Sequence, residues 1–325
     1  NIILDSDFGS GISSGLNGIN IADATLIKTV SSGDITLKGR SGTGNISGIL
    51  GIKSTGSNTS IDSAGDIYIS GISESTSSSS TRGVWLKGTL KALGNIMLEG
   101  QAKSTGNDYD ISIQDITINS GGDLQLDAQN GGRIRMAGNN VITAAGNQTY
   151  YTDNFSPSAG NQFNGSGVLS IYPDRDSDSF STSQSLSSLV FDTNLTGFNL
   201  GSSSNTSAIT LLNPITISGP ITIYGGNLAI NSALTATSSN INLHASGSVS
   251  QTAAITADDL GLHGSGTFTL TNTSNNIATI AGGNSATKLG SLSYVDAADG
   301  LTIGTVNPTG IFSTGPILIE TLEGN

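Results

Sequence analysis

The chain has 325 residues, of which Gly, Ser, Thr and Asn make up about half, and its 12 basic and 24 acidic residues give a formal net charge of −12. It has no cysteine and only two histidines, which excludes disulfides, cysteine nucleophiles and thiolate zinc sites. The acidic balance argues against nucleic acid as a partner, because phosphate binding needs clustered Lys and Arg. The sequence has no apolar run of about 18 residues, so no membrane insertion is expected.

A short unit, Gly-Asp/Asn-apolar-x-apolar, recurs along the first half of the chain. It begins at Gly33, Gly65, Gly94 and Gly122, at steps of 32, 29 and 28 residues, and it returns at Gly226. The apolar-x-apolar part predicts a short strand with one buried face. The Gly-Asp/Asn part predicts a turn in which Gly supplies a positive φ and the Asp or Asn side chain bonds its own backbone.

The second half of the chain repeats at shorter steps. Apolar-x-apolar triplets at 221–223, 241–243 and 260–262 begin 20 and 19 residues apart, and 301–303 and 317–319 continue the series. These strands are too short and the chain too poor in aromatic residues for a β-sandwich, and no segment sustains a helical spacing. The period predicts an all-β parallel β-helix, a solenoid of stacked coils. Its expected inward residues are Ile35, Leu37, Ile67, Ile69, Ile96, Leu98, Leu124, Leu126, Ile241, Leu243, Leu301 and Ile303.

Residues 147–205 depart from this pattern, with poor alternation, dense serine and most of the phenylalanines. We expect one irregular or protruding segment here, between a first part of the shaft at 1–146 and a second part at 206–325. Its aromatic residues form either a small secondary core or a contact surface for a ligand. The candidate interaction residues are Tyr150, Tyr151, Phe155, Phe163 and Tyr172. We also expect the chain to be a piece of a longer protein.

Three alternating carboxylates, Asp174, Asp176 and Asp178, resemble the start of an EF-hand calcium loop. The sixth position is Ser179 rather than Gly, and the twelfth is Ser185 rather than Glu. The two interpretations are a calcium site and a solvated loop, and no other metal or cofactor is expected.

The only histidines, His244 and His263, stand 19 residues apart, about one coil. They are therefore expected to stack as neighbours on one face, with Asp258 and Asp259 on the same part of the shaft, as a site or as two exposed corner side chains. No phosphate-binding loop, nucleophile elbow or metalloprotease motif is present, so no catalytic residue is predicted and the chain is not expected to be an enzyme.

The Gly-Asp/Asn-Ile-x-Leu units, the segment 140–150 and the run 301–306 resemble repeats of filamentous-haemagglutinin-like bacterial surface proteins. The resemblance implies a right-handed β-helical shaft, export through an outer-membrane pore by the two-partner route, and a place on the outside of a Gram-negative cell. It implies a structural, non-catalytic fibre or adhesin segment acting in adhesion, aggregation or matrix formation. The implied partners are other copies or neighbouring filaments, and cell-surface glycans or proteins. The alternative is a polysaccharide-binding or polysaccharide-degrading β-helix protein.

Overall fold

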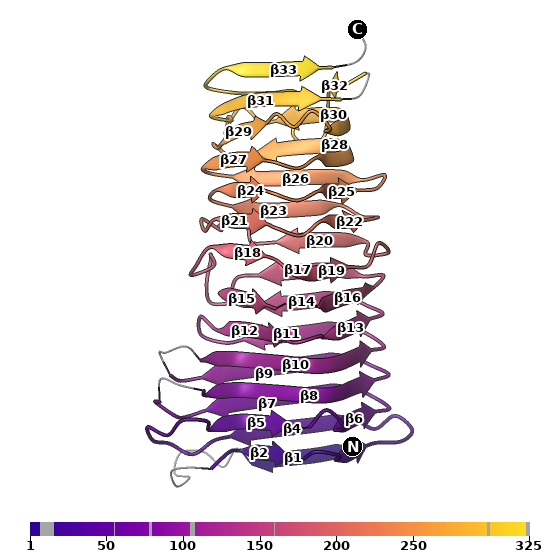
Figure 1. Ribbon diagram of the computed structural model, residues 1–325, viewed down its shortest axis with the longest axis vertical. Helices are drawn as coiled ribbons and strands as arrows, with labels where there is room; N and C mark the ends of the chain where they lie inside the picture. The colour runs from indigo at the N-terminus through magenta and orange to yellow at the C-terminus, as the bar shows by residue number, and fades with distance from the viewer. Residues whose placement is uncertain are drawn as a thin grey trace. The chain divides into compact units, whose positions relative to one another are not determined.

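The computed structural model describes residues 1–6, 16–54, 56–77, 80–104, 108–158, 160–297 and 300–322. Within these ranges the protein is all-β, and no segment forms a helix that could span a bilayer. The fold divides into two compact units, Asn1–Ser177 and Asp178–Asn325. In each unit the named strands pair in parallel, as stacked coils of a parallel β-helix require (Figure 1).

The first unit stacks its strands in two faces. One face has the order β1 (Ile2–Ser6), β4 (Ile35–Arg40), β7 (Ile67–Ser73), β9 (Ile96–Ala102), β11 (Leu124–Ala128), β14 (Gln148–Tyr151) and β17 (Val168–Tyr172). The other face holds β2 (Ile19–Ile21), β3 (Leu26–Lys28), β5 (Leu50–Ser54), β6 (Ser60–Ser63), β8 (Arg82–Ala92), β10 (Tyr109–Ser120), β12 (Arg133–Ala137), β13 (Val141–Ala144), β15 (Asn154–Pro157) and β16 (Asn161–Gly165).

The second unit repeats the scheme with shorter coils. One series holds β20 (Gly197–Leu200), β22 (Ile215–Ile217), β23 (Ile221–Gly225), β25 (Leu234–Ala236), β26 (Asn240–Ala245), β28 (Ile255–His263), β30 (Asn276–Gly282) and β32 (Thr302–Ile303), and β19 (Leu189–Phe191) precedes it in the chain. The other series is β18 (Gln184–Leu186), β21 (Ile209–Leu211), β24 (Leu228–Ile230), β27 (Ser248–Gln251), β29 (Thr267–Leu270), β31 (Ser291–Asp296) and β33 (Ile317–Thr321).

The predicted core is confirmed for ten of its twelve residues, which are at most 1% exposed: Ile35, Leu37, Ile67, Ile69, Ile96, Leu98, Leu124, Leu126, Ile241 and Leu243. Register partners stack like on like, as with Ile35 on Ile67 and Ile67 on Ile96. The prediction was wrong for Leu301, which is half-buried, and for Ile303, which is 56% exposed. Ile303 lies in the two-residue strand β32. Among the described strands β32 pairs with β30, so a neighbouring strand covers it on one side.

A column of Asp and Asn side chains joins successive coils of the first unit, and we call it the Asx ladder. Each Oδ1 accepts a hydrogen bond from a backbone amide one coil later, at 2.7–3.0 Å. Its acceptors are Asn1, Asp34, Asp66, Asn95, Asp123 and Asn147. The prediction that these side chains bond their own backbone was therefore wrong, because their partner belongs to the next coil.

The glycines before Asp66, Asn95 and Asp123 have a steric role. A Cβ at Gly65, Gly94 or Gly122 would lie under 3.0 Å from the Oδ1 of the preceding ladder residue. None of these three glycines has a positive φ. The sequence prediction of a positive φ was thus wrong here: glycine is needed because two coils approach closely at this corner.

Most of the described residues between 148 and 172, which were expected in an irregular segment, lie in the paired strands β14 to β17. Strand β14 pairs in register with β11 and with β17, and β16 pairs with β13. The stretch that follows, 173–183, has no strand. The aromatic excess that suggested an insertion is explained by the core, because Tyr150 and Phe163 are fully buried and their rings meet edge to face at 5.7 Å.

Candidate functional site

Three outward side chains of the second unit form a column, which we call the aromatic ladder: Tyr224 on β23, His244 on β26 and His263 on β28. Tyr224 is the register partner of His244, and His244 that of His263. The Tyr224 and His244 ring centroids lie 4.1 Å apart, and so do those of His244 and His263, with only 7° between the two imidazole planes. The expectation that the two histidines stack is confirmed, and the structure adds Tyr224.

Glycines occupy the register positions at both ends of this ladder. Gly201 follows Leu200, the partner of Ile223, and a Cβ there would lie 3.3 Å from the Cβ of Tyr224. Gly283 follows Gly282, the partner of Leu262, and so takes the position beside His263. No side chain continues the column past Tyr224 or His263.

The two histidines of the ladder are neutral at pH 7. Burial, and then the neighbouring His263, lower the pKa of His244 to about 3. Burial also lowers the pKa of His263. Each neutral imidazole has one nitrogen that donates a hydrogen bond and one that accepts. Within the described residues, the His244 ring and the Tyr224 hydroxyl make no hydrogen bond to protein.

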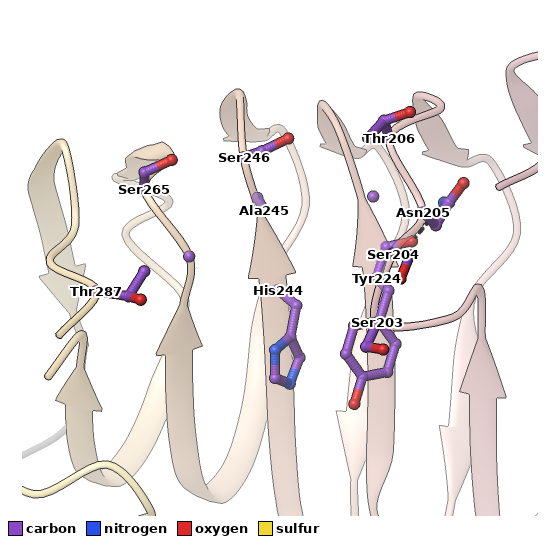
Figure 2. Close-up of a pocket in the computed structure, with 12 residues that line it drawn as sticks. Ser203, Ser204, Asn205, Thr206, Tyr224, His244, Ala245, Ser246, Ser265 and Thr287 are labelled. Carbon is purple, nitrogen blue, oxygen red and sulfur yellow. Dashed lines mark hydrogen bonds between the residues drawn. The ribbon is translucent and has the colours of Figure 1, made fainter. Parts of the chain in front are cut away.

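A groove of about 350 Å³ follows the ladder along the direction in which the coils stack (Figure 2). Its floor consists of Gly225, Ala245 and Gly264, the residues directly after the three ladder residues. Ladder side chains form one wall, and Figure 2 shows Ser246 and Ser265 on the opposite side, one per coil. None of the 12 lining residues is Asp, Glu, Lys or Arg.

A second hollow of about 330 Å³, the side pocket, lies against the same ladder. Thr222 and Asn242, partners in register two residues before the ladder, line it together with Asn307. Gly261 continues that row, and a Cβ there would lie 3.0 Å from His263 Nε2. Its missing side chain leaves room for Asn242 Oδ1 to lie 3.4 Å from His263 Nε2.

The ladder is poorly arranged for a metal ion. The lone pairs of the two imidazoles lie in nearly parallel planes and do not converge on one ion at about 2.0 Å. Among the described residues, no three His, Asp or Glu side chains form a group that could hold a metal. Asp259 pairs with Asn240 in register, and neither Asp258 nor Asp259 lines the groove or the side pocket.

The structure separates the residues proposed from sequence as an interaction surface. Tyr150 and Phe163 are fully buried and Phe155 is 4% exposed, so these three form core rather than surface. Tyr151 and Tyr172 are half-buried, and their rings lie tilted by 35° with centroids 5.9 Å apart.

The three carboxylates considered as a calcium site or a solvated loop are divided between the two units, with Asp174 and Asp176 in the first and Asp178 in the second. Asp174 is 2% exposed, and its Oδ2 accepts a hydrogen bond from the Gly131 amide at 2.5 Å. Asp176 and Asp178 are exposed. Asp174 therefore binds a backbone turn two coils earlier, since the register places Asp153 between Gly131 and Asp174.

The first unit gathers basic and aromatic side chains on β5, β8, β10 and β12. Around Trp85 lie the cations of Lys53 at 5.4 Å, Arg82 at 4.7 Å and Lys87 at 5.8 Å from the ring centroid. Arg133 and Arg135 lie 5.0 and 5.6 Å from the Tyr109 centroid. Burial, and then the charge of Arg135, lower the pKa of Arg82. This basic-aromatic face holds five of the 12 basic residues, although they lie far apart in the sequence.

Sequence reasoning missed Tyr224 and the basic-aromatic face. Aligning the triplets at 221, 241 and 260 places Tyr224, His244 and His263 at one position, so the repeat carried that signal. The face depends on register between coils of unequal length, which no local pattern gives.

No protein-family model matches the chain, and neither the curated proteins nor the solved structures contain a match to it. The geometry of the fold and of the aromatic ladder is therefore the basis for a functional assignment.

Proposed function

We propose that the chain is a structural, non-catalytic segment of an exported bacterial fibre or adhesin, acting in adhesion, aggregation or matrix formation at the cell surface. One observation carries the proposal: successive coils pack on each other in the same way, with apolar residues stacked in register and the Asx ladder joining the corners. Such a scheme adds reach with each coil and presents repeating outward side chains.

The partners that fit this proposal are further copies or neighbouring filaments, and glycans or proteins of another cell. Export to the outside of a Gram-negative cell through an outer-membrane pore is part of the same proposal. It is supported by the sequence resemblance to filamentous-haemagglutinin-like repeats and by the absence of cysteine.

The alternative function is that of a polysaccharide-binding or polysaccharide-degrading β-helix. The groove beside the aromatic ladder favours binding over degradation. A lyase or hydrolase needs an acid and a base placed across the scissile bond. The titratable side chains that line the groove, Tyr224 and His244, stack on each other in one wall and so do not face each other across a bound chain.

The proposal is tested by displaying the full chain on a non-adherent bacterium and measuring cell–cell aggregation and retention on surfaces under flow. Gain of either property is expected, and the Ile67→Asp chain, which should be strongly destabilised, is the matched control. No gain from a displayed and folded chain contradicts the proposal. Turnover of a polysaccharide by the purified chain, lost in His244→Ala, contradicts its non-catalytic part.

A further inference from the structure

We propose that the groove beside the aromatic ladder binds an extended, neutral oligosaccharide whose sugar chain lies along the stacking direction of the coils. The inference deepens the proposed function and rests on it for its biological setting, adhesion at a glycan-bearing surface. The site consists of the floor Gly225, Ala245 and Gly264 with its two walls.

The direction of the groove follows from the register. Its lining runs from Ser203 through the coils of Tyr224, His244 and Gly264 to Thr287, so it crosses successive coils rather than following one strand. Coils repeat at about 4.8 Å, the distance between neighbouring strands. That spacing is close to the length one pyranose ring adds to an extended chain. Successive sugars of a bound chain would therefore lie beside successive coils and face similar protein groups.

The chemistry of the walls fits sugars. One wall presents the edges of the Tyr224 and His244 rings, whose faces stack on each other along the direction of the coils. On the Gly201 side, where no side chain covers Tyr224 in register, the C–H face of one sugar can pack on its ring. The other wall presents Ser246 and Ser265, whose hydroxyls make no hydrogen bond to the described residues. Hydroxyl groups both donate and accept, as sugar hydroxyls do.

The charge of the lining selects a neutral ligand. Neither the groove nor the side pocket has an Asp, Glu, Lys or Arg in its lining. The low pKa of His244 keeps its ring neutral, so it offers one donor and one acceptor instead of a positive charge. Five of the 12 basic residues gather on the basic-aromatic face of the other unit, and Lys288, which follows the groove residue Thr287, is not part of the lining. The volume of about 350 Å³ is at the small end of ligand sites, as expected for a short stretch of a longer chain.

The test uses the two histidines as reporters, since the chain has no others and both lie in the ladder. Imidazole carbon–proton resonances are recorded while the full chain is titrated with hexaoses of glucose, mannose or N-acetylglucosamine, and with a sulfated oligosaccharide. The His263→Asn variant assigns the two signals. We expect at least one neutral hexaose to shift the His244 signal saturably.

Two exposed serines of one coil provide a matched pair of variants. Ser246→Tyr fills the groove, whereas Ser250→Tyr adds the same ring on β27, outside the groove and the side pocket. Both should keep the parent denaturation midpoint. Binding should weaken about ten-fold or more in Ser246→Tyr and stay unchanged in Ser250→Tyr.

Three results overturn the inference: no shift with any neutral hexaose, equal binding by Ser246→Tyr and the parent, or a response to the sulfated probe alone. The display assay is independent of this titration. A chain that aggregates cells without binding a hexaose refutes only the groove, and a chain that binds a hexaose without aggregating cells refutes only the adhesive function.

Discussion

The Asx ladder allows a quantitative test of why glycine precedes each ladder residue. In Gly94→Ala the new Cβ would lie under 3.0 Å from Asp66 Oδ1, so the two coils must separate or the carboxylate must leave the Asn95 amide. Overpacking of this kind costs about 1–3 kcal/mol. Asp66→Ala removes one hydrogen bond at an exposed corner and should cost about 1 kcal/mol. Asp66→Asn keeps the acceptor and should be nearly neutral.

The decisive measurement is the double variant Gly94→Ala/Asp66→Ala. With the carboxylate gone, the added methyl has room, so the cost of the pair should fall to about 1–2 kcal/mol, well below the sum of the single changes. Denaturation midpoints give the free energies, and hydrogen exchange of the Asn95 amide reports the ladder bond itself. Gly48→Ala is the control: Gly48 has a φ of +78° and open space around it, so its cost is conformational and independent of Asp66. Additive costs at Gly94 and Asp66 would refute the steric argument.

Three further predictions concern the core, the aromatic ladder and the basic-aromatic face. Ile67→Asp places an unpaired charge at a position 1% exposed and should cost several kcal/mol; an unchanged melting temperature would show that the register is wrong. Because the folded-state pKa of His244 is below its unfolded value, the unfolded state binds more protons as pH falls from about 6.5 toward 3, and stability should fall with it. After discounting for solvent screening the loss is no more than about 2 kcal/mol, and it should shrink in His244→Phe, which stacks without titrating. Trp85→Ala leaves three cations without their ring and should cost about 2–4 kcal/mol by urea denaturation, whereas Trp85→Phe should recover part of that loss.

The sequence alone predicted burial correctly where a residue's environment depends on its own strand. Ile35 and Leu37 alternate with polar neighbours at period two, and their burial follows from that pattern. It was insufficient where the outcome depends on the next coil. The local sequence identifies Asp66 as a turn residue. Only the register shows that its Oδ1 accepts a hydrogen bond from the Asn95 amide.

The aromatic residues illustrate the same limit. Phe163 in a serine-rich segment suggested a protrusion, yet it stacks in register on Ile142 and is fully buried in the core. The aromatic ladder was half foreseen, because His244 and His263 are one coil apart, and Tyr224 was missed because its residue type differs. Gly201 and Gly261, which leave space beside the ladder, carry no signal until the register is known.

The Asx ladder also has a polarity. At every step the acceptor belongs to the earlier coil and the donor to the later one, as when Asp34 Oδ1 receives the Asp66 amide. A completed coil therefore has an Oδ1 atom ready to accept a hydrogen bond from a backbone amide of the following coil. That amide lies only some tens of residues later in the chain. Closing such short segments one after another has a small entropic cost at each step. In a polypeptide delivered amino end first, each new coil would pack on a coil that has already formed. Delivery of the chain and its folding can therefore advance together in one direction.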